Sequence, residues 1–311
     1  MVAIKNILNK YSKKLDRLDL ELIIAYVLGK NREFVLSHPE YKLKKTQITN
    51  LKSQISRRIN HEPLAYILGE KEFYGLKFKV NKNTLIPRPE TEMMVTLAIK
   101  KILDTKYGIL DTKIIDVGTG SGNILISLAH RLEHRSCLPA MLRIAKQVGN
   151  KYKFYGIDIH GKALAVAKQN AKIHRLDKKI KFLRGNLLNP IISNLKFISH
   201  NSKLIILANL PYLSPEIYFS CSKDIKKYEP KSALTSQKEG LAHYEKLFKQ
   251  IIGLKQKCSM LHALCLMEIS PEQKEKITKL IRKYFPKAKM KFYKDLSRRW
   301  RICELKIFND Q

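Results

Sequence analysis

A glycine-rich stretch lies between an apolar segment and a helical pattern near the middle of the chain. Residues 116–123 read Asp-Val-Gly-Thr-Gly-Ser-Gly-Asn. Glycine lets a backbone turn sharply and approach a ligand closely, because no Cβ atom stands in the way. The spacing is G-x-G-x-G, not the G-x-G-x-x-G with which dinucleotide folds bind a pyrophosphate. A bound nucleoside is therefore favoured over a turn that binds nothing, and its contacts are expected at Gly118, Thr119, Gly120, Ser121 and Gly122.

The next two predicted strands also end on residues suited to a nucleoside. Asp158 ends the segment Tyr-Gly-Ile-Asp, and an ionised carboxylate, which only accepts hydrogen bonds, suits the two hydroxyls of a ribose. A lone aspartate there would more often cap a helix, but the preceding glycine loop favours the ribose interpretation. Asn186 and Leu187 follow the third strand. They are expected to hydrogen-bond to and pack on a nucleobase, although asparagine before a loop is also common in turns.

The fourth predicted strand ends at Asn209, Leu210, Pro211 and Tyr212. Open α/β sheets bind ligands at the carboxyl ends of their strands, so this tetrapeptide should face the same crevice as the glycine loop. An amide or aromatic amino nitrogen is a poor nucleophile because its lone pair is delocalised. The side-chain oxygen of Asn209 and the carbonyl of Leu210 can accept its two hydrogens and direct its lone pair at an electrophile. Pro211 stiffens the turn, and the ring of Tyr212 can stack on a flat acceptor.

Taken alone, the same tetrapeptide would be an ordinary turn followed by a core tyrosine. Behind a glycine loop and Asp158, in this order along the chain, it predicts a clamp for a planar nitrogen.

Strands and helices alternate beyond residue 110, which is typical of a parallel sheet with helices on both faces. We therefore predict an α/β fold with a seven-stranded, Rossmann-like sheet whose last strand is antiparallel. The predicted strands are 113–117, 153–157, 181–183, 203–208, 263–269, 289–293 and 301–307. The predicted helices include 122–132, 162–174 and 237–252, and residues 133–152 form a long connection.

The chain before this domain has a different pattern of apolar residues. In residues 1–70, apolar side chains recur at helical spacing, and one such run, through Leu18 and Leu22, ends at Gly29, a plausible helix stop. These residues predict a small helical bundle. Residues 73–80 alternate apolar and polar side chains, and residues 81–83 follow as a turn, so residues 71–86 predict a β-hairpin linker. Residues 87–311 then form the α/β domain.

Thr91 is expected to be the N-cap of the first helix of that domain.

Composition limits the function classes. The chain has 311 residues, with 60 Lys or Arg and 27 Asp or Glu, and a net charge of +33. The basic residues are spread along the chain and are mostly lysine, whereas arginine is the residue of specific phosphate and base recognition. The charge permits a ribosomal neighbourhood without requiring it. Five scattered cysteines argue against a disulfide framework or a zinc site. Without a signal pattern or a long apolar run, we expect a cytoplasmic protein without metal.

An ordered series of motifs extends over nearly the whole chain. It comprises Pro-Leu-Ala-Tyr-Ile-Leu-Gly at 63–69, Phe-Tyr-Gly at 73–75, Leu-Ile-Pro-Arg-Pro-Glu-Thr-Glu at 85–92, the glycine loop, Asn-Leu-Pro-Tyr at 209–212, Tyr-Glu-Pro at 228–230 and Gly-Leu at 240–241. This series resembles the release-factor glutamine N5-methyltransferase family of the HemK/PrmC type. The segment 85–92 is the most discriminating part, because amine methyltransferases in general lack it.

The resemblance implies a class I S-adenosylmethionine-dependent methyltransferase domain preceded by a substrate-recognition bundle. It implies that Gly118 to Gly122 and Asp158 bind S-adenosylmethionine, with Asn186, Leu187 and Asn209 as further contacts. It also implies that the tetrapeptide 209–212 holds the substrate amide. The acceptor would be the glutamine of the Gly-Gly-Gln loop in class I peptide-chain release factors, and neither a membrane nor a nucleic-acid substrate is expected.

Three departures from the family pattern stand out. Leu210 replaces a usual proline, Asn186 replaces a usual aspartate with Leu187 where some members carry an aromatic, and Ser270 replaces a usual glycine. Asn-Leu-Pro-Tyr is also the form found in ribosomal-RNA adenine dimethyltransferases, so a nucleic-acid adenine N6-methyltransferase is the first alternative. A non-catalytic nucleotide-binding or ribosome-associated module is the second.

Overall fold

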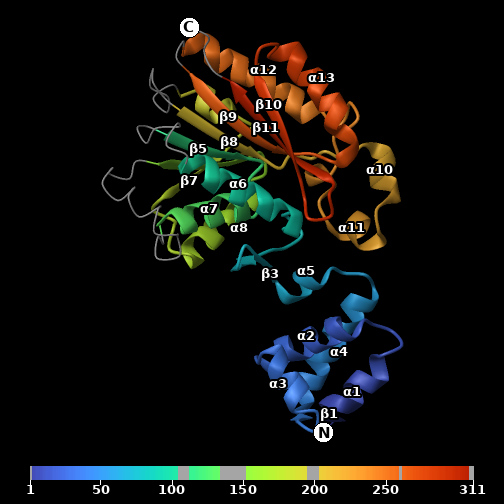
Figure 1. The fold of residues 1–311 in the computed structure, drawn as a ribbon. Coiled ribbons are helices and arrows are strands. Elements are labelled where there is room, and N and C mark those ends of the chain that lie inside the picture. The colour runs from blue at the N-terminus through green and yellow to red at the C-terminus, as the bar shows by residue number, and fades with distance from the viewer. Residues whose placement is uncertain (1, 104–111, 134–151, 195–202, 259–260, 308–311) are drawn as a thin grey trace.

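The computed structural model describes residues 2–103, 112–133, 152–194, 203–258 and 261–307. Figure 1 shows a small helical body at the N-terminal end and a larger α/β body that contains the rest of the chain. Most of the connection expected at 133–152 lies outside the described residues. Among the residues described, no helix is both long and apolar enough to cross a membrane.

A seven-stranded sheet forms the centre of the larger body, in the order β10-β11-β9-β8-β5-β6-β7. Its five parallel strands are β5 (Thr112–Val117), β6 (Lys153–Asp158), β7 (Ile180–Arg184), β8 (Lys203–Ala208) and β9 (His262–Glu268). The strands β10 (Lys289–Lys294) and β11 (Trp300–Ile307) are antiparallel to their neighbours. The predicted fold class is confirmed, including the antiparallel last strand.

The sheet is covered on both faces, which explains why its inner strands are almost wholly apolar. Successive side chains of a strand point to opposite faces. On β5, Ile114 packs with α6 (Glu92–Leu103) and α7 (Asn123–Glu133), whereas Ile115 and Val117 pack in the other cluster, with α12 (Ala242–Lys257) and α13 (Lys274–Tyr284). The remaining larger helix, α8 (Gly161–Ile173), lies on the α6–α7 face (Figure 1). Strand order reverses around β5, which places a ligand crevice at its carboxyl end.

Two predicted helix starts lie next to the crevice, and they differ in outcome. α6 begins at Glu92, as expected with Thr91 at the N-cap position, although Thr91 also ends a 3₁₀ turn, Pro89–Thr91. The helix predicted from 237 begins at Ala242 instead. Residues 238–240 have φ values of 53°, 55° and 85°, so they form a turn. At Gly240 a Cβ atom would lie 1.9 Å from the carbonyl oxygen of Tyr212, so only glycine fits.

Between β8 and α12 the chain forms a separate excursion. It contains α10 (Pro215–Ser220), α11 (Lys223–Tyr228) and a 3₁₀ turn at Lys231–Ala233, whereas the short α9 (Asn189–Ile192) precedes β8 and is not part of it. A single parallel bridge, Leu213 to Thr235, closes the base of the excursion. It therefore starts and ends beside the tetrapeptide 209–212.

The N-terminal body is built from β1 (Val2–Ala3), α1 (Ile4–Tyr11), α2 (Arg17–Leu28), α3 (Arg32–Ser37), β2 (Lys42–Leu43), α4 (Lys45–Ile59) and α5 (Leu64–Leu68). The helix α2 ends at Gly29, which has φ 63° as a left-handed cap. The apolar face predicted for α2 is only partly the one that packs, because Ala25 is buried but Leu18 is not. Leu20, Ile23 and Ile24 are buried, whereas Leu18 is 46% exposed.

The hairpin consists of β3 (Glu70–Phe73) and β4 (Leu76–Lys79) around a turn at Tyr74 and Gly75. Phe73 and Phe78 are buried in the cluster formed with α6, α7 and α8. The side chain of Asn170 on α8 accepts from Lys79 N at 2.7 Å and donates to Ser121 O at 2.8 Å. The hairpin is thus packed against the larger body, and the buried amide of Asn170 connects it to the glycine loop.

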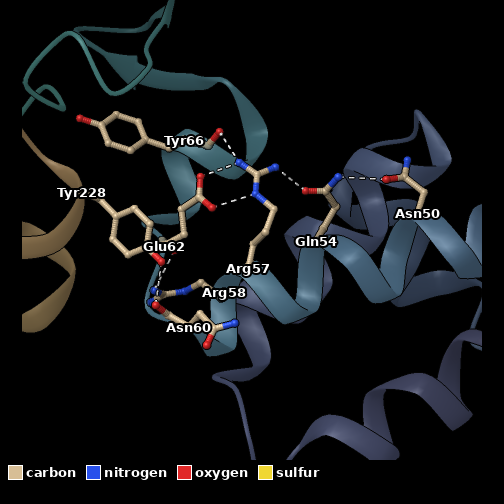
Figure 2. A network of polar contacts seen from close by, with 8 residues as sticks. All are labelled: Asn50, Gln54, Arg57, Arg58, Asn60, Glu62, Tyr66 and Tyr228. Carbon is tan, nitrogen blue, oxygen red and sulfur yellow. Dashed lines mark hydrogen bonds and ion pairs between the residues drawn. The ribbon is translucent and has the colours of Figure 1, made fainter.

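The bundle meets the larger body through a polar network (Figure 2). The hydroxyl of Tyr228, at the end of α11, donates to Asn60 O at 2.9 Å. Arg57 pairs with Glu62 at 2.5 Å and also reaches Gln54 and the carbonyl of Tyr66. The hydrogen bond from Tyr228 to Asn60 therefore joins α11 of the larger body to the polar network of the bundle.

Candidate active site

A cavity of about 450 Å³ lies at the carboxyl ends of the parallel strands. That volume lies within the usual range for small-molecule sites. Most of the residues predicted to bind the two ligands line it: Gly118, Thr119, Gly120, Ser121, Asp158, Asn186, Leu187, Asn209, Leu210 and Pro211. Gly122 and Tyr212 lie outside this lining. Four separate strand ends therefore converge on one cavity.

Backbone hydrogen bonds to the neighbouring strand β6 hold the glycine loop in place. Gly118 N and Thr119 N both donate to Ile157 O, at 2.8 and 2.9 Å. Gly118 has φ 74°, and a Cβ atom there would lie 3.1 Å from Leu210 Cδ2. Gly122 faces the helices, where a Cβ atom would lie 2.8 Å from Ile126 Cδ1, which explains its absence from the cavity wall. The loop and the tetrapeptide are therefore adjacent at Gly118, and a larger side chain there would press on Leu210.

Asp158 presents an acceptor to the cavity. Its Oδ2 accepts from Gly120 N and its Oδ1 from His160 N, both at 2.9 Å. A carboxylate oxygen can accept more than one hydrogen bond, so both oxygens can also accept from ligand hydroxyls. The side chain is 8% exposed and lines the cavity. This arrangement fits a ribose diol, the group for which the residue was predicted.

A second carboxyl lies under the loop and does not line the cavity. Burial raises the pKa of Asp116 to about 7, the negative charge of Asp158 adds to the rise, and the hydrogen bond from Thr119 opposes it. Thr119 Oγ1 donates to Asp116 Oδ2 at 2.6 Å. Asp116 therefore fixes the conformation of the loop from below.

The turn at Asn186 and Leu187 is fixed by a residue of α12. Gln250 donates to Asn186 O at 3.2 Å and accepts from Leu188 N at 2.8 Å. Leu187 has φ 54°, lies 6% exposed and contributes to the cavity wall. The turn therefore places one amide and one apolar side chain where a nucleobase was predicted.

The tetrapeptide is supported by residues far away in the sequence. Asn209 Nδ2 donates to Thr91 Oγ1 at 3.2 Å, and Thr91 Oγ1 donates to Glu268 Oε2 at 2.6 Å. The Tyr212 hydroxyl donates to Glu268 Oε1 at 3.3 Å. Asn209 and Tyr212 are thus joined through a single buried carboxyl.

Burial raises the pKa of Glu268 to about 7, although the hydrogen bond from Thr91, the charge of Arg301 and the bond from Tyr212 each oppose the rise. Burial and the neighbouring Glu268 also raise the pKa of the Tyr212 hydroxyl. The tyrosine is therefore a neutral hydrogen-bond donor at physiological pH.

The backbone of the tetrapeptide is held by Gln273. Its Nε2 donates to Tyr212 O and to Glu239 O, both at 3.0 Å, and its Oε1 accepts from Ser270 N at 3.1 Å. Ser270 has φ −74° and ψ 151°, an extended conformation open to any residue. Serine therefore meets no backbone strain at this position, where the family usually has glycine.

The segment before α6 forms the opposite wall, with residues 82–85, Pro87 and Arg88 in the lining. Arg88 Nη2 donates to Glu229 Oε1 at 2.5 Å, and Ile86 N donates to Glu229 Oε2 at 3.1 Å. Glu229 is 5% exposed and follows α11 directly. The most discriminating motif, at 85–92, and the motif at 228–230 therefore meet in one ion pair beside the cavity.

Sequence reasoning missed Glu268, Gln273, Gln250 and the role of Thr91. A signal existed for Glu268, which is a lone charged residue near the end of an apolar predicted strand. Nothing in the sequence indicated that Thr91 would pair with a residue 177 positions later. Within the described ranges, no group of three His, Cys, Asp or Glu side chains is placed to hold a metal ion.

The chain was compared with known proteins. The PrmC N-terminal domain profile matches residues 3–69, and a methyltransferase domain profile matches residues 110–283. The release factor glutamine methyltransferase of Bacillus anthracis is 30% identical over 288 residues, which cover 92% of this chain and 91% of that protein. The one from Dictyoglomus turgidum is 31% identical, covering 95% of this chain and 93% of that protein. The one from Buchnera aphidicola subsp. Baizongia pistaciae is 33% identical, covering 91% and 92%.

Similarity to solved structures is weaker. The catalytic domain of hMettl16 in complex with the MAT2A 3'UTR hairpin 6 covers 93% of each chain, with a TM-score of 0.49 and 17% identity. The extent and level of the sequence matches decide the family. The chain belongs to the release factor glutamine methyltransferase family.

Proposed function

We propose that this protein transfers a methyl group from S-adenosylmethionine to the side-chain amide nitrogen of the glutamine in the Gly-Gly-Gln loop of class I peptide-chain release factors. The observation that carries the proposal is that the glycine loop and the tetrapeptide line one cavity and lie side by side in it, since a Cβ atom at Gly118 would come within 3.1 Å of Leu210 Cδ2. A cofactor held by the loop and an amide held by the tetrapeptide would lie next to each other in one cavity.

S-adenosylmethionine supplies an electrophilic methyl group on a sulfonium. The glycine loop, Asp158, Asn186, Leu187 and Asn209 would bind it. The Asp158 oxygens would accept from the ribose hydroxyls, and Leu187 would cover the adenine ring.

The acceptor amide would be held by Asn209 to Tyr212. The side-chain oxygen of Asn209 and the carbonyl oxygen of Leu210 would each accept one N–H, which directs the nitrogen lone pair toward the methyl group. Only a backbone carbonyl is needed at 210, so leucine serves there. Catalysis would come from positioning and from exclusion of water, effects that can supply several kcal/mol. We assign no general base, because the proton can leave after transfer.

We propose residues 1–70 as the part that holds the body of the release factor, residues 71–86 as the linker and residues 87–311 as the methyltransferase domain. The hydrogen bond between Tyr228 and Asn60 supports the role proposed for the bundle. It links the bundle to the excursion that ends beside the tetrapeptide (Figure 2). The net charge of +33 would suit work near the ribosome in the cytoplasm.

In the decisive experiment, the purified protein is incubated with labelled S-adenosylmethionine in two separate reactions. One reaction contains an intact release factor, and the other contains ribosomal RNA. Mass spectrometry should find one added methyl on the glutamine of the Gly-Gly-Gln loop. Methyl groups found only on adenine would refute the proposal and favour a nucleic-acid enzyme, for which steep salt dependence is also expected. Transfer to neither acceptor would favour a non-catalytic module.

A variant that begins near residue 70 tests the role of the bundle. It should bind S-adenosylhomocysteine almost as the full chain does and lose most activity on the intact factor. Equal activity of the two proteins on the intact factor would remove the bundle from substrate recognition.

A further inference from the structure

One buried carboxylate holds the two polar side chains of the tetrapeptide. Glu268 is the last residue of β9 and is 1% exposed. Its Oε2 accepts from the Thr91 hydroxyl at 2.6 Å, and its Oε1 accepts from the Tyr212 hydroxyl at 3.3 Å. Thr91 in turn accepts from Asn209 Nδ2 at 3.2 Å. The hydrogen-bond chain therefore runs from Glu268 through Thr91 to Asn209.

The direction of each bond in this chain is fixed by proton count. A hydroxyl has one hydrogen, and an ionised carboxylate has none to give. Thr91 therefore gives its hydrogen to Glu268 and has only an acceptor left for Asn209. The amide nitrogen of Asn209 must turn toward Thr91, so its oxygen is left free to accept from another donor. The clamp chemistry requires that orientation, because an NH₂ group in its place would repel the N–H of an acceptor amide.

We propose that Glu268 is a positioning residue of the transfer reaction, acting through Thr91 to set the orientation of the Asn209 amide and directly on Tyr212. The inference rests on the proposed function, since it concerns the same clamp. Glu268 itself does not line the cavity, so it would not touch either ligand.

Charged and titratable groups lie near Glu268 on several elements. Glu90 lies before α6, Arg301 lies on β11, and Tyr244 of α12 donates to the Glu268 carbonyl. Burial raises the pKa of Glu268 to about 7, the charge of Arg301 opposes the rise, and the exposed Glu90 adds to it. A protonated Glu268 has a hydrogen of its own to donate, so it no longer dictates the direction of the Thr91 bond. Turnover should therefore rise as Glu268 ionises.

The first test compares Thr91→Val with Thr91→Ser. Valine keeps the shape and removes the hydroxyl, whereas serine keeps the hydroxyl. We expect Thr91→Val to lower kcat by about 10- to 100-fold, the scale of a misoriented reacting group, with KM and S-adenosylhomocysteine affinity little changed. Thr91→Ser should restore most of kcat. Equal kcat values for Thr91→Val and the wild type would overturn the inference.

The second test uses Glu268→Gln and a pH profile. A glutamine has one acceptor oxygen, so it can serve Thr91 or Tyr212 but not both. We expect a reduced kcat and loss of a rise in kcat near pH 7. Glu304→Gln is the matched control, because Glu304 is equally buried and pairs with Lys101 away from the cavity. A pH profile for Glu268→Gln that matches the wild type would overturn the inference.

The outcomes separate the inference from the proposed function. If the wild type methylates release factor and Thr91→Val does so with equal kcat, the inference fails and the function stands. If the wild type methylates adenine instead, the function fails, and the same kcat comparison on that acceptor still decides the inference. Crystal structures with S-adenosylhomocysteine add a readout independent of the acceptor. The Asn209 amide should be ordered in the wild type and turned or disordered in Thr91→Val, and an unchanged amide would contradict the inference.

Discussion

The two sides of the cavity are held by different kinds of hydrogen bond. On the glycine-loop side, backbone N–H groups are the main donors, as in Gly120 N to the Asp158 carboxylate at 2.9 Å, with one bond between side chains, from Thr119 to Asp116. On the tetrapeptide side the bonds are made between side chains, as in Thr91 to Glu268 at 2.6 Å. Gly120 and Asp158 are 38 residues apart, whereas Thr91 and Glu268 are 177 apart. The hydrogen bonds of the loop side therefore join residues that are closer in the sequence, whereas those of the tetrapeptide side form only when the complete sheet has folded.

This difference predicts different consequences of mutation. Backbone hydrogen bonds survive most side-chain substitutions. A substitution on the loop side should therefore remove only the contact made by that side chain, and the protein should bind its cofactor less tightly. Side-chain bonds are lost by single substitutions, so damage on the tetrapeptide side should appear as loss of turnover.

Asn209→Ala should have the largest effect. It removes the acceptor proposed to orient the nucleophile, and loss of one such group typically costs a factor of about 10² to 10³ in kcat. Affinity for S-adenosylhomocysteine should remain largely intact, as measured by calorimetry beside single-turnover methyl transfer. Asn50→Ala, at an exposed asparagine of the bundle, is the matched control. Retention of more than half of wild-type turnover would show that the clamp lies elsewhere.

Asp158→Ala should act on the other side. Losing hydrogen bonds to a charged group corresponds to about 1.5–3 kcal/mol, or roughly 10- to 100-fold in the Kd for S-adenosylhomocysteine, measured by calorimetry. Asp177→Ala, at an exposed aspartate after α8, is the control. Unchanged affinity in Asp158→Ala would assign the ribose to another residue. A fall in kcat at saturating cofactor, equal to that of Asn209→Ala, would remove the contrast between the two sides.

The contrast also explains what the sequence could and could not predict. The strands and the glycine loop were placed within a few residues because their signals are local: apolar runs, a turn motif and an acid at a strand end. The hydrogen bond from Thr91 to Glu268 was missed because Glu268 is brought near only by the folded sheet. The start of α12 was misplaced because the turn before it is shaped by a backbone contact between Gly240 and Tyr212.

A similar limit applies in the bundle. Helical spacing correctly predicted that α2 would end at Gly29, yet it put Leu18 on the buried face. This helix is apolar on more than one side, so periodicity alone could not select the face that packs. The choice depends on where α4 and α1 lie, which is a property of the tertiary structure.

Each side of the cavity holds one carboxyl with a raised pKa, and this predicts a pH dependence of stability. The pKa rises from 3.8 to about 7 for Asp116 and from 4.5 to about 7 for Glu268. Between these limits the folded protein keeps protons that the unfolded chain has released. The free energy of unfolding should therefore fall as pH rises from about 4 to 7, by at most about 1.4 kcal/mol per pH unit for each group.

Urea unfolding at intervals from pH 5 to 8 measures this slope. Asp116→Asn and Glu268→Gln should each flatten it, whereas the control Glu304→Gln should not, because the pKa of Glu304 is lowered and its effect falls at more acidic pH. A slope that is the same in all four proteins would mean that neither carboxyl is protonated in the folded state near neutrality.

Tyr228→Phe should have the smallest effect and should act only on the acceptor side. It removes the 2.9 Å hydrogen bond to Asn60 O that joins α11 to the bundle (Figure 2). A net contribution of about 0.5–1.5 kcal/mol for such a bond should loosen the bundle without unfolding it. We expect KM for intact release factor to rise a few-fold, while kcat and S-adenosylhomocysteine affinity stay close to wild type. Tyr41→Phe is the matched control, because Tyr41 lies at the other end of the bundle, where its carbonyl accepts from Ile4 N. A weaker affinity for S-adenosylhomocysteine in Tyr228→Phe would show that the bundle contact also supports the glycine loop, and the two sides of the cavity would then be one mechanical unit.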